Sequence, residues 1–185
     1  MIDNDEIRQR SPYKRGADDG LLFGLLLTAI FFAGIFSVDY PVAGLLAAAG
    51  MLSVPFVIYK FLRRSYVADI GMTLLSSLWM QGIMIFGCGA LISGIIATVY
   101  LKWVDPDFIN ARVADAIRLY RESDMPSGER MAETLEAMVK SHLIPSAVQI
   151  VVEMIWLSIF SGSLLSLLMA LLARARSVGK TNTKR

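Results

Sequence analysis

The chain has 185 residues, of which 55% are hydrophobic and 18% are charged, and its formal net charge is +2. An ordinary globular domain carries about 25% charged residues, so a water-soluble fold would have too little polar surface to cover this chain. The mild net charge, with basic residues beside apolar runs, argues against nucleic-acid binding. The composition therefore indicates a membrane protein.

Long apolar runs predict the membrane spans. A transmembrane helix needs about 20 mostly apolar residues, because it crosses about 30 Å of hydrocarbon at about 1.5 Å per residue. The runs predict a transmembrane helical hairpin over 20–59, a third helix over 75–103 and a fourth over 146–173. Since unpaired backbone groups are not tolerated in hydrocarbon, we expect an all-α, polytopic protein with four transmembrane helices.

The distribution of lysine and arginine predicts the orientation. Basic residues are concentrated in the N-terminal segment 1–19, in the connection 60–74 and in the tail 174–185. Cytoplasmic segments carry such an excess, so these three segments should lie on the cytoplasmic side. We therefore expect a protein of the cytoplasmic (inner) membrane with both termini in the cytoplasm.

The segment 104–145 is polar and should form a short extracytoplasmic helical hairpin. Asp105, Pro106 and Asp107 are typical of a helix start, with Asp105 as the cap and Pro106 in the first turn. Apolar residues then recur at helical spacing in two short runs. Such helices are too small to bury a core alone, so their apolar stripes should pack on the spans, on the bilayer or on a partner.

A charge within the fourth span predicts a candidate intramembrane polar site. Glu153 lies in an otherwise uncharged run, and a carboxyl group within a span often marks an ion, proton or substrate path. Gln149 lies one turn earlier, and Thr98 or Lys102 of the third span could reach the carboxylate. A hydrogen-bonded structural carboxylate is the alternative interpretation.

Small residues at intervals of four form stripes that allow helices to approach closely. They favour packing among the four spans, with homo-oligomerisation or a pathway between bundles as the alternative. The stripes comprise Gly20, Gly24 and Thr28; Gly89, Ser93 and Ala97; and Ser158, Gly162, Ser166 and Ala170.

The sequence lacks recognisable catalytic or metal-binding patterns. His142 is the single histidine and Cys88 the single cysteine, and neither belongs to a triad or a metal-ligand motif. We expect no catalytic residues, no metal and no cofactor. The basic residues Lys60, Arg63 and Arg64 could hold anionic lipid headgroups, although topology alone would place basic residues there.

The order of these features resembles the domain-of-unknown-function 4199 family over nearly the whole chain. The features are two closely spaced spans, a basic connection, a long third span rich in small residues, and the run V-D-P-D-F-I from Val104 to Ile109 before a polar helical segment. The resemblance implies no catalytic residues. It suggests an accessory role in the cell envelope, in association with a membrane glycosyltransferase.

Two functions of different class remain. The first is a non-enzymatic accessory or scaffolding subunit that contacts the lipid bilayer and either a second copy or another membrane protein. The alternative is a small oligomeric transporter or channel that uses Glu153 as an intramembrane carboxylate. An enzyme acting on lipid-linked substrates is a weaker third hypothesis, which depends on Asp105, Asp107 and His142.

Overall fold

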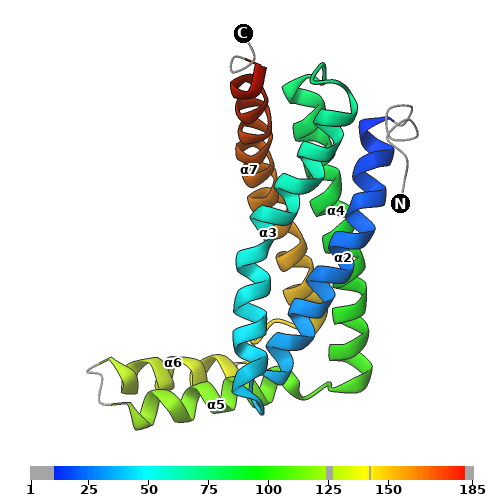
Figure 1. The fold of residues 1–185 in the computed structure, drawn as a ribbon. Coiled ribbons are helices and arrows are strands. Elements are labelled where there is room, and N and C mark those ends of the chain that lie inside the picture. The colour runs from blue at the N-terminus through cyan, green and yellow to red at the C-terminus, as the bar shows by residue number, and fades with distance from the viewer. Residues whose placement is uncertain (1–10, 124–126, 142, 182–185) are drawn as a thin grey trace. The chain divides into compact units, whose positions relative to one another are not determined.

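The computed structural model describes residues 11–123, 127–141 and 143–181, with side chains described as far as residue 175. Every regular element in these ranges is helical, so the predicted all-α class is confirmed. His142, which the third hypothesis required, lies outside the described residues. The elements are α2 (Pro12–Phe36), α3 (Pro41–Ala68), α4 (Leu75–Val99), the π-helical turn η1 (Tyr100–Val104), α5 (Phe108–Glu122), α6 (Gly128–Lys140) and α7 (Ala147–Thr181) (Figure 1).

Four of these helices are long and apolar enough to cross a membrane, as predicted. The four segments are Pro12–Phe36, Pro41–Ala68, Leu75–Val104 and Ala147–Ala175. Many large apolar side chains on them are exposed, which suits helices surrounded by lipid rather than water.

Two spans extend further than their apolar runs. Ser11 caps α2 by accepting a hydrogen bond from the Lys14 amide at 3.4 Å, and Pro12 is the first helical residue, so α2 begins well before Gly20. Helix α3 continues through Ala68, so most of the expected 60–74 connection is helical. Basic side chains are good helix formers, and this explains why the helix does not end where the apolar run ends.

The expected start of the first helix in the polar segment was wrong by two residues. Asp107, and not Asp105, occupies the N-cap position of α5, and it makes no side-chain capping bond. Asp105 instead follows η1, and its backbone amide donates to the Tyr100 carbonyl at 3.0 Å. The Asp105 carbonyl accepts from the Phe108 amide at 3.3 Å, so a single turn separates η1 from α5.

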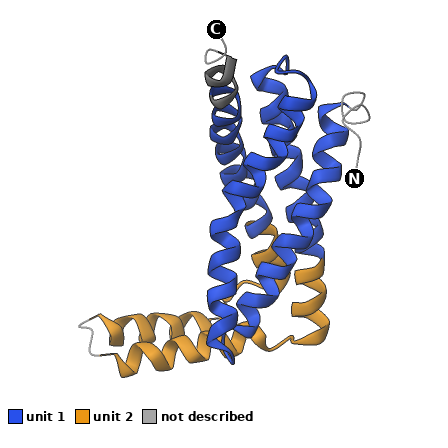
Figure 2. Cartoon of the chain, viewed as in Figure 1, with its two compact units in different colours: residues 1–95, 154–185 blue, residues 96–153 orange. Residues whose placement is uncertain are grey.

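The chain divides into two compact units, which are described separately (Figure 2). Unit 1 comprises residues 1–95 and 154–185, and unit 2 comprises residues 96–153. In unit 1, the Phe23 and Phe86 rings meet edge to face with centroids 4.9 Å apart. Around them lie the fully buried side chains of Ile58, Leu62, Leu78 and Ile85.

Unit 2 contains α5 and α6, which lie side by side (Figure 1). The Arg121 guanidinium of α5 pairs with the Glu136 carboxylate of α6 at 2.5 Å. Ala132 is fully buried, and Gly128 lies so near the Tyr120 carbonyl that an added Cβ would be only 2.5 Å from its oxygen. Small residues therefore allow these two polar helices to approach each other.

Candidate functional site

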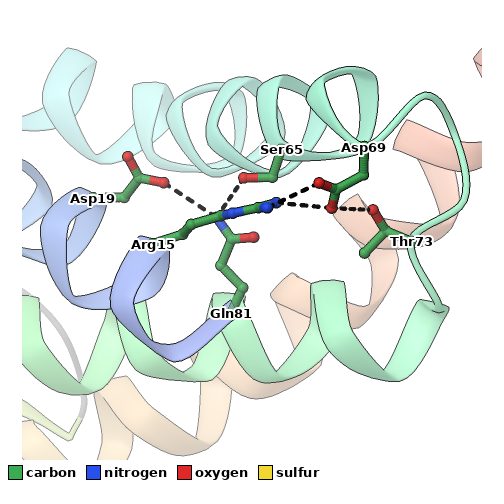
Figure 3. A network of polar contacts seen from close by, with 6 residues as sticks. All are labelled: Arg15, Asp19, Ser65, Asp69, Thr73 and Gln81. Atoms are coloured by element: carbon green, nitrogen blue, oxygen red, sulfur yellow. Dashed lines mark hydrogen bonds and ion pairs between the residues drawn. The ribbon is translucent and has the colours of Figure 1, made fainter. Parts of the chain in front are cut away.

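A buried polar network lies in unit 1, where side chains from three spans and the turn after α3 converge (Figure 3). Helix α2 contributes two side chains, α3 and the turn after it contribute three, and α4 contributes one. The members are Arg15, Asp19, Ser65, Asp69, Thr73 and Gln81. This network joins segments that are distant in sequence.

An ion pair with two parallel hydrogen bonds forms one half of the network. Arg15 Nη1 donates to Asp69 Oδ2 and Arg15 Nη2 donates to Asp69 Oδ1, each at 2.8 Å. Thr73 Oγ1 also donates to Asp69 Oδ2, at 2.6 Å. The Arg15 side chain is 8% exposed and the Asp69 side chain is 21% exposed. A guanidinium matches a carboxylate in this geometry, so the pair fixes the direction of α2 relative to the end of α3.

The second half centres on Gln81, which is 1% exposed. Its side-chain amide nitrogen donates to Ser65 Oγ at 2.8 Å and to Asp19 Oδ2 at 3.2 Å. Asp19 and Ser65 are themselves buried, at 5% and 2% exposure. One amide on α4 thus satisfies buried acceptors on α2 and α3, which avoids the penalty of leaving them without a donor.

A close helix contact allows Gln81 to reach its partners. A Cβ added to Gly16 would lie 2.7 Å from the Met84 Cβ and 2.9 Å from the Gln81 carbonyl oxygen. A larger side chain at position 16 would therefore push α2 away from α4. Glycine is needed here so that the polar side chains of the two helices can meet.

The turn that holds Asp69 is strained. Ile70 has φ +56° and Gly71 has φ +75°, both in the left-handed region. The Gly71 amide closes the end of α3 by donating to the Tyr66 carbonyl at 2.9 Å. Glycine suits this conformation, but a β-branched residue such as isoleucine does not, and the cost is about 1 to 2 kcal/mol. The chain tolerates this strain immediately beside the ion pair.

The residues of the expected site around Glu153 are largely exposed and do not form a network. Glu153 is exposed and makes no hydrogen bond or ion pair with another described residue. Lys102 is also exposed, and its ammonium group lies 5.7 Å from the centre of the Trp103 ring. Thr98 has interactions of its own, and it is not a partner of Glu153. Among the described side chains, the structure does not assemble the predicted site.

Gln149 has a local structural role instead. Its side-chain oxygen accepts from the Ser146 amide at 2.8 Å and from the Ser146 hydroxyl at 3.0 Å. The Ser146 hydroxyl in turn accepts from the Gln149 amide at 3.4 Å. This reciprocal pair is a capping box at the start of α7, and the spacing S-x-x-Q in the sequence was the signal for it.

The glycines of the first two small-residue stripes, Gly20, Gly24 and Gly89, lie at contacts between helices of unit 1. A Cβ on Gly24 would lie 3.0 Å from the Ile92 Cβ and 3.3 Å from the Gly89 Cα. A Cβ on Gly20 would lie 2.7 Å from the Cys88 Cβ. Thr28 donates back to the Gly24 carbonyl at 2.8 Å. Helices α2 and α4 therefore use these positions to pack on each other.

The stripe on α7 is used in the same way. Gly162, Ser166 and Ala170 are all buried. A Cβ on Gly162 would overlap the Phe86 ring, and a Cβ on Gly82 would overlap Ser166. Gly162 and Ser166 are therefore covered by α4 within the same chain, and a second copy could not reach them without displacing α4.

The network had only weak signals in the sequence. Asp19 adjoins an apolar run and Gln81 lies within one, but neither belongs to a recognisable site motif. An amide inside a span and a charge at its edge both need partners. Only the packing of α2 against α4 identifies those partners. Among the described residues, no group of three or more His, Cys, Asp or Glu side chains could hold a metal ion.

Comparison with known proteins finds one family. The family model described as "Protein of unknown function (DUF4199)" matches residues 18–175, which include most of the first span, the other three spans and the polar segment between the last two. No curated protein and no solved structure matches the chain.

Proposed function

The chain belongs to the DUF4199 family of proteins of unknown function, whose match covers residues 18–175, and we propose that it is a non-enzymatic accessory or scaffolding subunit of the bacterial cell envelope. It resides in the cytoplasmic membrane with both termini in the cytoplasm. The basic side chains of the N-terminal segment, the 60–74 segment and the tail support this orientation. Helices α5 and α6 then lie on the extracytoplasmic side.

The observation that carries this proposal is the incomplete burial of α5 and α6. No side chain of α5 is buried, and α6 buries only Gly128 and Ala132. Leu119 is 70% exposed and Met131 is 50% exposed on helices that otherwise carry many charges. Exposed apolar side chains framed by polar ones are typical of surfaces that bind a protein or a membrane.

The same unit also contains a groove. It has a volume of about 340 Å³ and is lined by residues from the start of α5, the end of α6 and the start of α7, among them Ile109, Asn110, Val139 and Ile144. Its lining mixes apolar side chains with an amide and hydroxyl group, which suits a protein segment better than lipid alone. The family resemblance suggests a membrane glycosyltransferase as the partner.

Photo-cross-linking in native membranes tests this proposal. A photoreactive amino acid at position 119 should capture one membrane protein in stoichiometric yield, and Leu119→Ser with Met131→Ser should abolish its co-purification. The matched control, Arg118→Ser with Arg130→Ser, changes polar side chains on the same helices and should retain the partner. Cross-links to lipid alone would contradict the accessory role.

A transporter remains a second candidate, and the structure directs attention from Glu153 to Asp19. Asp19 is a buried carboxylate held between spans, whereas Glu153 is exposed. Buried carboxylates in bundles often belong to ion or proton paths. In liposomes containing the purified protein, this role predicts flux that Asp19→Asn abolishes and Glu153→Gln does not. Equal flux in both variants would exclude Asp19 as the coupling group.

A further inference from the structure

One exposed face of α3 combines basic and aromatic side chains. A shallow groove of about 530 Å³ is lined by Phe56, Tyr59, Lys60, Arg63, Arg64 and Val67. Their spacing of three or four residues places them on one face of the helix. The buried residues Ile58, Leu62 and Tyr66 lie on the other face, where α3 packs in the core of unit 1.

The face carries a strong local excess of positive charge. Helix α3 contains three basic residues and no acidic residue. Asp69 at its end is engaged by Arg15. Asp19 is close enough to attract Arg64, and it also accepts a hydrogen bond from Gln81. Lys60 and Arg63 make no ion pair with an acidic side chain among the described residues. A singly charged anion would therefore be electrostatically favoured at this face.

Tyr59 holds Arg63 in a defined position. Arg63 Nη1 donates to the Tyr59 hydroxyl at 3.1 Å, and the guanidinium lies 5.8 Å from the centre of the Tyr59 ring. A guanidinium has five N–H donors in a fixed fork, so this single bond leaves donors for a phosphate group. An arginine already positioned in this way loses less entropy when an anion binds.

Apolar side chains continue the same face toward the centre of the span. Phe56 is 70% exposed and Leu52 is 72% exposed. Leu52 lies about 12 Å along the helix from Lys60, at about 1.5 Å per residue. This distance is close to the thickness of one hydrocarbon leaflet, about 15 Å. The face therefore has a charged end at the depth of lipid headgroups and an apolar part that is long enough to contact one acyl chain.

We propose that this face of α3 is a binding site for one anionic glycerophospholipid. Lys60, Arg63 and Arg64 hold the phosphate, and Phe56 and Leu52 contact an acyl chain. The combination of the charged end and the apolar part favours a lipid over a free phosphate, because a free phosphate would use only the charged end. Topology explains basic residues near a span end, but it does not explain an arginine held by a tyrosine within a groove.

Native mass spectrometry of the purified full chain tests this site. The protein is incubated in detergent with equal amounts of phosphatidylglycerol and phosphatidylcholine. We expect phosphatidylglycerol to bind at least about tenfold more tightly, since each cation near an anionic lipid contributes appreciably. The variant K60Q/R63Q/R64Q should reduce this ratio to near one. The control R112Q/R118Q/R130Q removes the same charge from α5 and α6 and should retain the preference.

Further measurements identify the ligand and keep the site testable if a variant does not fold. Excess inorganic phosphate should not displace phosphatidylglycerol, and complete displacement would overturn the lipid assignment. Phosphatidylglycerol, but not phosphatidylcholine, should raise the wild-type Tm, so the site remains testable if the triple variant fails to fold. Tyr59→Phe should weaken binding about threefold, by releasing Arg63. An unchanged ratio in the triple variant, or an equal loss in the control, would overturn the proposal.

Discussion

Asp19 in unit 1 and Glu153 in unit 2 are both carboxylates near apolar helices, but they occupy opposite environments. Asp19 is 5% exposed and accepts a hydrogen bond from Gln81. Glu153 lies within the more apolar sequence, yet it is exposed and has no hydrogen-bond or ion-pair partner among the described residues. The apolar character of the neighbouring sequence therefore does not predict how buried a polar side chain is.

This difference extends to the two units as a whole. Unit 1 buries several polar side chains and glycines at contacts between helices, whereas α5 and α6 of unit 2 bury only Gly128 and Ala132. Substitutions at contacts of unit 1 should therefore change the free energy of unfolding far more than substitutions in unit 2. The predictions below test this contrast by unfolding the purified protein in detergent.

The largest effect is expected for the ion pair. Asp69→Ala should lower the free energy of unfolding by about 3 kcal/mol, because it leaves the buried Arg15 guanidinium without its carboxylate. Replacing both partners, as Arg15→Met with Asp69→Leu, should recover most of this loss. The control Glu122→Ala breaks an exposed pair with Arg118 and should cost less than about 1 kcal/mol. Equal losses in the two single variants would remove the contrast between the units.

A smaller loss is expected where α7 meets α4. Gly162→Ala should cost about 2 kcal/mol, because the new methyl group overlaps the Phe86 ring. The control is Gly87→Ala on α4, where an added Cβ meets nothing within 4 Å. This control should be neutral or should stabilise the helix by up to about 1 kcal/mol. A neutral Gly162→Ala variant would show that α7 does not depend on this contact.

A gain in stability is expected at the strained turn. Ile70→Asn should raise the free energy of unfolding by about 1 kcal/mol, because asparagine tolerates a positive φ much better than a β-branched residue. Ile70 is 65% exposed, so little burial is lost. Ile70→Val keeps the branch at Cβ and should leave stability unchanged. A loss in the asparagine variant would indicate that the isoleucine side chain itself is needed.

The smallest effect is expected at Glu153. Glu153→Gln should change the free energy of unfolding by less than about 0.5 kcal/mol, because the carboxylate is exposed and unpartnered among the described residues. Gln149→Ala, one turn earlier on α7, removes the capping box and should cost about 1 kcal/mol. A large effect of Glu153→Gln would restore this residue as a structural or functional centre.

The sequence alone predicted the helical class, the four spans and the family, because each depends on long runs of local hydropathy or on the order of segments. It predicted the candidate site poorly. Helical spacing predicted that Gln149 lies beside Glu153, but the Gln149 side-chain oxygen accepts a hydrogen bond from Ser146 instead. Arg15 and Asp69 are 54 positions apart, and no local pattern indicates that they meet.

Hydrophobic length and composition are local properties, so the sequence by itself determined that this chain forms four apolar helices with a polar, amphipathic segment before the last. Which polar groups are buried, and which small residues are covered, depends on contacts between helices distant in sequence. Gly16 allows α2 to approach α4, and Gln81 then reaches Ser65 and Asp19. Hydrogen-bond partners such as these depend on which side chains lie close together in space, and only the tertiary structure of unit 1 determines that.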